Sequence, residues 1–212
     1  DDVVLATGIK PRQLDIEGIT HPKVKSYLQV LRDKEAVGQK VAIIGAGGIG
    51  FDTASYLAEE ESLTMNTEAW MKEWGVDKAY DNAGALVAPE SEKAEREIFL
   101  LQRKTTKVGK GLGKTTGWIH RAFLQKKGVQ MIPGVTYKAV NDQGLLIEVN
   151  GEEKLLDVDN VIICAGQEPD RTLEQVLKDA GQNVHLIGGA DVASELDAKR
   201  AIRQGAELAA KI

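Results

Sequence analysis

One stretch of sequence decides the fold: Val41-Ala42-Ile43-Ile44-Gly45-Ala46-Gly47-Gly48-Ile49-Gly50. It begins with four apolar residues in a row, which is typical of a parallel strand buried on both faces. Three glycines follow at the spacing G-x-G-x-x-G, and they lead into residues 51–58, where apolar residues recur at helical spacing. A strand, a glycine turn and a helix in this order predict a dinucleotide-binding site.

Each glycine of this turn has its own physical use. At Gly45 the missing Cβ permits a tight turn, at Gly47 it lets the backbone approach a pyrophosphate, and at Gly50 it lets helix and strand pack closely. The N–H groups of Gly48 and Ile49, at the positive end of the helix dipole, would then hold the anion. A glycine-rich turn without a ligand is the alternative, but three glycines weaken a fold unless something must come close.

The rest of the chain alternates strands and helices, as α/β proteins do. We therefore expect an α/β protein with a Rossmann-like three-layer parallel sheet and a β-meander. Predicted strands cover residues 3–6, 98–101, 129–132, 161–166 and 184–187; predicted helices cover 24–31, 51–58, 119–126, 173–177 and 198–209; the meander covers 136–140, 145–149 and 152–156; and a polar insertion, with a short helix around Trp70 and Trp74, fills 59–96.

Size and composition exclude several classes of protein. The chain has 212 residues, a net charge of −5 and 42% hydrophobic residues, enough for one large domain or two small ones. No apolar run approaches the ~20 residues that span a bilayer, which argues against a membrane protein. One cysteine, Cys164, excludes a disulfide scaffold, and the acidic balance argues against nucleic-acid binding. No secretory signal is present, so we expect the cytoplasm.

The beginning of the chain points to a piece of a longer protein. Asp1-Asp2 stands in place of an initiator methionine, and Val3-Val4-Leu5-Ala6 has the pattern of a buried strand. Proteins rarely start inside a core strand, so we expect further sequence before Asp1. An N-terminal edge strand is the alternative.

Charge along the chain indicates which dinucleotide binds. An NAD site typically places an acid after the second strand, where it accepts hydrogen bonds from the ribose 2′-hydroxyl. Here Gln102-Arg103-Lys104 follows residues 98–101, and a guanidinium can pair with the 2′-phosphate of NADP in bidentate fashion. Nor does any acid occur between Glu97 and Asp142. That interval predicts a site for a polyanionic ligand, or else a basic face that docks on an acidic partner domain. Its cations are Arg103, Lys104, Lys107, Lys110, Lys114, Arg121, Lys126, Lys127 and Lys138.

A second glycine-rich string, Gly111-Leu112-Gly113-Lys114-Thr115-Thr116, is not a P-loop. That motif requires a glycine where Val108 stands, and it requires a preceding apolar strand. We expect instead a mobile loop that brings Lys114 to the phosphates, followed by a helix starting near Thr115. The sequence identifies no catalytic residue and predicts no metal site. His120 and His185 have no carboxylate or cysteine at ligand spacing, and His21 stands before a proline in a connector.

Four strings occur in the order found in two-dinucleotide flavoprotein reductases, in which an NAD(P) domain is inserted within an FAD domain. They are Ala6-Thr7-Gly8, the three glycines of the turn, Cys164-Ala165-Gly166-Gln167-Glu168-Pro169 and Gly188-Gly189-Ala190-Asp191. Residues 101–104, 111–121 and 187–193 look closely like the C-terminal part of the bacterial NADPH-dependent 2,4-dienoyl-CoA reductases. The likeness covers essentially the whole chain and is weakest over residues 59–96.

This resemblance implies two nucleotide sites. It implies an NADPH-binding domain over residues 39–170, and a partial FAD-binding domain with connectors over residues 1–38 and 171–212. The helix expected to begin near Glu195 would lie along the flavin. The implied NADPH contacts are Gly45, Gly47, Gly48, Ile49, Gly50, Arg103, Lys104, Lys114, Ala165 and Gly166; the implied FAD contacts are Ala6, Thr7, Gly8, Gly189 and Asp191.

The same resemblance implies an electron relay. NADPH would reduce FAD, and electrons would pass through an iron–sulfur cluster to FMN in a separate barrel domain that reduces dienoyl-CoA. This chain has neither the cysteines for a cluster nor the barrel, so its partners would be the missing FMN-barrel and FAD-domain segments of the same polypeptide. The isolated chain should not turn over the acyl substrate. An NADH-dependent enoate reductase or amine dehydrogenase relative is one alternative, and a nucleotide-binding module without redox chemistry is another.

Overall fold

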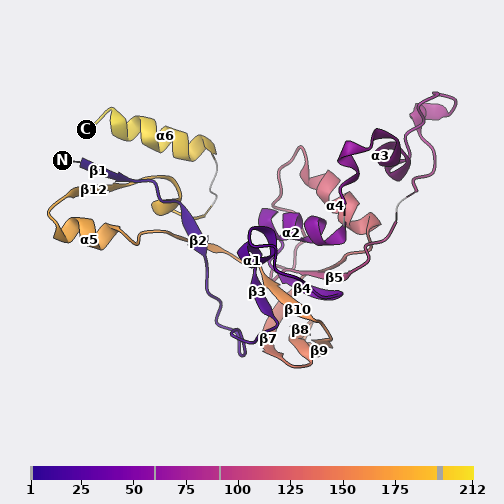
Figure 1. The fold of residues 1–212 in the computed structure, drawn as a ribbon, viewed down its shortest axis with the longest axis horizontal. Helices are drawn as coiled ribbons and strands as arrows, with labels where there is room; N and C mark the ends of the chain where they lie inside the picture. The colour runs from indigo at the N-terminus through magenta and orange to yellow at the C-terminus, as the bar shows by residue number, and fades with distance from the viewer. Residues whose placement is uncertain (1, 60, 91, 195–197) are drawn as a thin grey trace. The chain divides into compact units, whose positions relative to one another are not determined.

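The structure, a computed structural model, describes residues 2–59, 61–90, 92–194 and 198–212 (Figure 1). The chain forms two compact units. The larger is Leu14–Ala165, and the smaller combines Asp1–Gln13 with Gly166–Ile212. Each is described by itself below.

A five-stranded, all-parallel sheet forms the centre of the larger unit, which confirms the expected α/β class. Its order is β3 (Val24–Ser26), β10 (Asn160–Ile163), β4 (Lys40–Ile44), β5 (Glu97–Leu101) and β6 (Gln130–Ile132).

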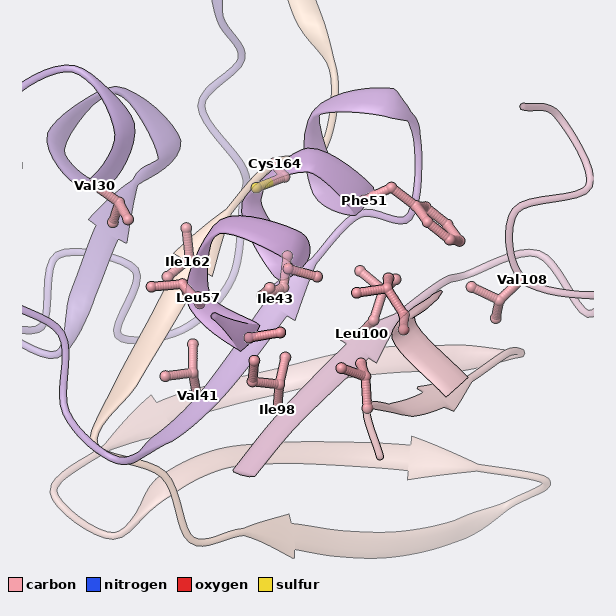
Figure 2. Close-up of a cluster of buried hydrophobic side chains, with 14 residues drawn as sticks. Val30, Val41, Ile43, Phe51, Leu57, Ile98, Leu100, Val108, Ile162 and Cys164 are labelled. Atoms are coloured by element: carbon pink, nitrogen blue, oxygen red, sulfur yellow. The ribbon is translucent and has the colours of Figure 1, made fainter. Parts of the chain in front are cut away.

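The central strand β4 is buried on both faces, as its run of apolar residues predicts. Successive side chains of a strand point to opposite faces. Val41 and Ile43 accordingly belong to one buried cluster, shown in Figure 2, and Ala42 and Ile44 belong to another. The first cluster lies under the helices and the second under the meander, so one strand contributes to both cores of a three-layer unit.

Helices cover the first of these two faces. They are α1 (Tyr27–Leu31), α2 (Gly48–Ala58) and α4 (Gly117–Lys126). Phe51 and Leu57 of α2 and Leu124 of α4 are almost completely buried there. Burying a side chain of this kind stabilises a fold by about 1.5–3 kcal/mol, so this face alone holds α2 firmly against the sheet.

The predicted meander covers the second face. It consists of β7 (Val135–Asn141), β8 (Gly144–Val149) and β9 (Glu152–Leu156), paired antiparallel. Asn150 and Gly151 connect the last two strands with φ of 54° and 83°. Positive φ at both central residues is the requirement of a type I′ hairpin turn, for which Asn-Gly is the preferred pair.

The insertion consists of η1 (Leu63–Met65), the predicted short helix α3 (Thr67–Trp74) and η2 (Ala83–Ala85). The Trp70 and Trp74 rings pack with centroids 6.0 Å apart. Two lysines of the long basic interval fasten α3 to the rest of the unit. Lys126 Nζ donates to the Glu73 carbonyl and lies 4.1 Å from the Trp74 ring centroid. Lys127 Nζ lies 2.8 Å from a Glu73 carboxylate oxygen.

The structure differs from expectation at residues 24–31, where the sequence predicts a continuous helix. Val24 instead pairs with Val161 as part of β3. The helix starts only at Tyr27, because Ser26 and Gln29 form a capping box that satisfies the first free N–H groups. The larger compact unit begins at Leu14 and includes β3 in its central sheet, whereas we expect the NADPH-binding domain over residues 39–170.

The smaller unit contains two short sheets. In one, β1 (Asp2–Leu5) runs parallel to β12 (Asn183–Leu186); in the other, β2 (Ile9–Pro11) runs antiparallel to β11 (Gln167–Pro169). Next to the second pair, the Arg12 N–H donates to the Gly166 carbonyl at 3.3 Å. The strand predicted as buried is only partly so: Leu5 is 5% exposed but Val4 is 40% exposed, since β1 has one partner strand within the described residues.

The smaller unit also contains α5 (Glu174–Asp179), η3 (Gly188–Ala190) and α6 (Ala198–Ala209). The helix that we expected to begin near Glu195 corresponds to α6, but Glu195 itself lies outside the described residues. In the ranges that the structure describes, no helix combines the length and the apolar character needed to cross a bilayer.

Candidate functional site

The glycine turn joins β4 to α2, and two of its glycines are required by the fold. Gly45 has φ of 108°, and a Cβ there would lie 2.8 Å from backbone atoms of Cys164 and Ala165. A Cβ on Gly50 would lie 1.8 Å from the Gly45 carbonyl oxygen. Gly47 and Gly48 are different, because a Cβ at either would meet nothing within 4 Å. The turn is therefore closed on its protein side and open on its solvent side.

The open side presents the N-terminus of α2. Gly47 is the N-cap residue, and within the described residues no side chain caps this helix end. The N–H groups of Gly48 and Ile49 belong to the first turn, which has no carbonyl partners inside the helix. Gly47 and Gly48 are exposed. Free N–H groups, the helix dipole and an uncovered backbone together make this end of α2 suitable for a phosphate.

The predicted basic residues lie at the same edge of the sheet. Ile44 is in register with Leu101, and the Gly45 N–H donates to the Leu101 carbonyl at 3.0 Å. Because β4 and β5 are parallel, the residues that follow them emerge together. Arg103 and Lys104 are exposed there, two and three positions beyond Leu101.

The loop after β5 is fastened against the first turn of α2. Val108 is 4% exposed, and a Cβ on Gly109 would lie 2.6 Å from the Phe51 ring. The Arg121 guanidinium of α4 donates to the Val108 carbonyl at 3.1 Å and to the Gly109 carbonyl at 3.0 Å. The exposed segment 103–107 thus lies between β5 at one end and an anchored turn at the other.

The nine cations of the basic interval fall into two sets. Arg121, Lys126 and Lys127 hold the loop and the insertion, and Lys138 pairs with Glu148 at 2.6 Å. The other five are exposed, and none has an ion-pair partner in the part of the chain that the structure describes. We call them the free cations: Arg103, Lys104, Lys107, Lys110 and Lys114. Among the cations of this interval, the charge available to a ligand therefore lies in residues 103–114.

Two further predicted NADPH contacts follow β10. The Cys164 N–H donates to the Ile44 carbonyl at 2.8 Å, which brings Ala165 beside Gly45. Gly166 comes next, with φ of 87°, and it is the first residue of this segment to belong to the smaller unit. The structure thus brings Ala165 to the glycine turn.

Cys164 is a core residue. Burial raises the pKa of its thiol to about 12, an effect that the Thr53 hydroxyl, 3.5 Å from Sγ, opposes. Such a thiol is neither a good nucleophile nor a good metal ligand at neutral pH. No group of three metal-ligating side chains occurs among the described residues.

The residues predicted for FAD lie in the smaller unit. Ala6, Thr7 and Gly8 follow β1; the Thr7 hydroxyl donates to the Asp170 carbonyl, and the Asp170 N–H donates to the Gly8 carbonyl at 3.0 Å. A Cβ on Gly189 would lie 3.0 Å from the Gly8 carbonyl carbon. The two ends of the chain thus bring Gly8 and Gly189 into contact.

Asp191, the remaining predicted FAD contact, is held by groups that the sequence did not single out. Its carboxylate accepts from Gln204 Nε2 at 2.7 Å, and Gln204 Oε1 accepts from the Gly188 N–H at 2.8 Å. Arg171 donates to the carbonyls of Ala190 and Asp191. No short-range pattern links these residues, because their partners are distant in sequence.

Two histidines have carboxylate partners that sequence spacing did not reveal. His185 Nε2 lies 2.7 Å from Asp2, and His21 Nε2 lies 3.1 Å from Asp142. The hydrogen bond from His185 lowers the pKa of Asp2. Both pairs are solvent-accessible, and such pairs contribute little to stability.

Comparison with known proteins adds to this geometry. The family model described as pyridine nucleotide-disulphide oxidoreductase matches residues 1–200. The chain is 27% identical over 188 residues to a metal reductase of Desulforamulus reducens, covering 89% of this chain and 27% of that protein. It is 27% identical over 191 residues to cinnamate reductase of Clostridium sporogenes, covering 90% and 24%. The chain thus spans about a quarter of the length of these curated relatives.

The fold is also similar to that of 2-naphthoyl-CoA reductase, solved in complex with 2-naphthoyl-CoA. The TM-score is 0.74 at 24% sequence identity, and the match covers 100% of this chain and 27% of that one.

Proposed function

The chain belongs to the pyridine nucleotide-disulphide oxidoreductase family, and from this premise we propose that it is the NADPH-binding module of a flavin-dependent oxidoreductase. When bound, NADPH supplies a hydride and FAD accepts it. The chain's own residues bind and orient these groups. The N–H groups of Gly48 and Ile49 would hold the pyrophosphate, Gly47 would let it approach, and Arg103 and Lys104 would pair with the 2′-phosphate.

One observation gives the strongest support for NADPH as the nucleotide. The hydrogen bond between Gly45 and Leu101 joins the open glycine turn to the strand that ends beside Arg103 and Lys104. Neither cation has a carboxylate partner within the described residues, so both are available to a phosphate. Residues 102–104 contain no acid to receive the ribose 2′-hydroxyl of NADH.

For the complete protein we propose that the electrons reduce a 2,4-dienoyl-CoA, as in fatty-acid β-oxidation. The support is the likeness of residues 101–104, 111–121 and 187–193 to the dienoyl-CoA reductases. Two compared proteins, by their names, reduce cinnamate and 2-naphthoyl-CoA, a conjugated acid and a conjugated acyl-CoA. The FMN and the iron–sulfur cluster belong to other domains in this proposal, because cluster ligation requires several thiolates and this chain has one cysteine.

The partners in this proposal are further segments of the same polypeptide, an FMN barrel and the rest of an FAD domain. The support is that the chain spans about a quarter of the length of its curated relatives, and that its resemblance to the dienoyl-CoA reductases implies only part of the FAD contacts. We place the protein in the cytoplasm, whose reducing conditions suit a chain with one free thiol, Cys164.

The test compares two probes that differ in one phosphate. The chain is titrated calorimetrically with 2′,5′-ADP and 5′-ADP, and then with NADPH and NADH. Charge-assisted hydrogen bonds contribute about 1.5–3 kcal/mol, so the wild-type chain should prefer the 2′-phosphorylated member of each pair by about 10-fold to 150-fold. Arg103→Ala should remove most of this preference.

Arg32→Ala is the matched control. Arg32 is an exposed arginine at the C-terminal end of α1, paired with Asp33 and not part of the site. This variant should keep the full preference. Equal affinity of the wild-type chain for NADPH and NADH would overturn the assignment to NADPH, and failure to bind either would overturn nucleotide binding altogether.

A further inference from the structure

Gln102 lies where the glycine turn and the free cations meet, and its backbone is fixed. It directly follows Leu101, the last residue of β5. Its N–H donates to the Ile132 carbonyl at 2.9 Å, and its carbonyl accepts from the Val135 N–H at 3.0 Å. The peptide groups of Gln102 therefore continue the pairing of the sheet, and only its side chain is available for another task.

That side chain closes the turn that follows. Gln102 Nε2 donates to the Lys104 carbonyl at 2.9 Å and to the Thr106 carbonyl at 2.8 Å. The Lys104 carbonyl also accepts from the Gly134 N–H at 3.1 Å. Both amide hydrogens of Gln102 are thus used to draw two carbonyl oxygens of the cationic segment toward the sheet.

The arrangement favours an anion at this turn. Carbonyl oxygens are the negative ends of peptide dipoles, and here two of them face Gln102, while the side chains of Arg103 and Lys104 are exposed. Without the amide, the Thr106 carbonyl would lose this donor and could turn outward to compete with a phosphate for the same cations, while the Lys104 carbonyl would keep only the hydrogen bond from the Gly134 N–H. The far end of the segment does not depend on Gln102, because Arg121 and Phe51 fasten residues 108 and 109.

Only an amide suits this position. A carboxylate of the same shape would place an acceptor oxygen, in the position of Nε2, against the acceptor carbonyls of Lys104 and Thr106, and it would add a negative charge beside the 2′-phosphate. Position 102 also follows the second strand, where an NAD site carries its acid. Gln102 therefore folds the turn, and a glutamate in its place would favour NADH over NADPH.

We infer that Gln102 is a positioning residue that sets the selectivity for a 2′-phosphorylated nucleotide, by folding residues 103–106 so that the cations and not the carbonyls meet the phosphate. This inference rests on the proposed function. It extends it from the groups that contact the phosphate to the group that arranges them.

The test uses two substitutions at position 102. Gln102→Met removes both donors at similar volume, and Gln102→Glu also adds the charge. Gln143→Glu, in the exposed turn between β7 and β8, is the matched charge control. Dissociation constants are measured for 2′,5′-ADP and 5′-ADP, and amide exchange is followed over residues 103–107.

We expect Gln102→Met to weaken the binding of 2′,5′-ADP about 5-fold to 10-fold, and Gln102→Glu to weaken it at least about 30-fold. In either variant the dissociation constant of 5′-ADP should change less than about 3-fold. Amide exchange should accelerate over residues 103–107 and stay as in the wild type over β4 and α2. Gln143→Glu should change neither dissociation constant.

Three outcomes are distinct. If the Gln102 variants lose affinity for 2′,5′-ADP and 5′-ADP by the same factor, the residue only stabilises the fold, and the inference is overturned. Unchanged dissociation constants for both nucleotides would overturn it as well. A wild-type chain that does not distinguish 2′,5′-ADP from 5′-ADP would overturn the proposed NADPH function first, before any variant is compared. Melting temperatures of the variants show whether each is folded.

Discussion

The Lys127 ammonium lies 2.8 Å from a carboxylate oxygen of Glu73, in the interior between α4 and α3. A Glu59 carboxylate oxygen lies 3.2 Å from the same nitrogen. The Lys127 residue is only 7% exposed. A lysine of the basic interval between Glu97 and Asp142 therefore joins the C-terminal end of α2 and the insertion to α4.

Removing the Lys127 ammonium should lower the free energy of unfolding considerably. Lys127→Met leaves the carboxylates of Glu59 and Glu73 close together without their common cation, and breaking a buried pair typically costs about 3–5 kcal/mol. We expect a loss of this size in the free energy of unfolding, measured in urea. Lys154→Met, on exposed β9, should change it by less than about 0.5 kcal/mol. A loss below about 1 kcal/mol for Lys127→Met would contradict the role given to the pair.

The same pair predicts a dependence on alkaline pH. Burial acts to lower the pKa of Lys127, but its hydrogen bonds to Glu73 and Glu59 outweigh burial, so the pKa is raised above 10.5. The stabilisation is therefore complete below that ordinary value and is lost as pH rises through the higher pKa of the folded state.

The measurement is the difference in unfolding free energy between the wild type and Lys127→Met. It should stay constant from about pH 7 to about pH 10 and shrink above. Burial also raises the pKa of Tyr137, which weakens the fold above pH 10, but equally in both proteins, so the difference isolates Lys127. A difference that shrinks toward acidic pH instead would contradict the assignment.

Two alanine substitutions separate the structural from the binding role of the glycines. Gly50→Ala forces a methyl group against the Gly45 carbonyl, and overpacking of this kind costs about 1–3 kcal/mol or more. Gly47→Ala places its methyl group in open space and should change the melting temperature little. We expect Gly47→Ala to weaken the binding of NADPH at least about 10-fold, because the methyl group occupies the space through which the pyrophosphate approaches the N-terminus of α2. Unchanged NADPH affinity in a folded Gly47→Ala protein would mean that the pyrophosphate does not approach there.

Cys164 should be unreactive in the folded chain. A thiol pKa of about 12, against an ordinary 9.0, leaves roughly a thousandth of the usual thiolate. Labelling by a thiol-reactive disulfide reagent at pH 8 should therefore be slow in the native protein and rapid after denaturation. Fast native labelling would show that the strand β10 opens readily, or that the thiol is not buried.

The three-layer core could be predicted from local pattern because its strands are continuous apolar runs. Ile98-Phe99-Leu100-Leu101 and Val41-Ala42-Ile43-Ile44 are buried on both faces, and a helical surface would not require such runs. The strand β3 could not be predicted, since Val24 is fixed by pairing with Val161, far along the chain.

The candidate site could be located from the sequence in outline and not in detail. The glycine spacing and the absence of acids gave its position and its charge. Which cations are free depended on partners such as Glu73 and Glu148, and the role of Gln102 depended on the path of the turn that it closes. Such roles follow from long-range or conformational contacts, which composition and spacing do not encode. The binding residues themselves remain predictions until a nucleotide is titrated.

The contact between Arg12 and Gly166 has an evolutionary consequence. Because these two residues are hydrogen-bonded to each other, the points where the chain leaves the smaller unit and returns to it are neighbours. The larger unit (152 residues, 14–165) is thus an inserted domain whose two ends lie close together. Such a domain can be exchanged between genes without changing the path of the chain in the smaller unit. Under the proposed function, recombination at this point would join the same smaller unit to a module that binds a different nucleotide.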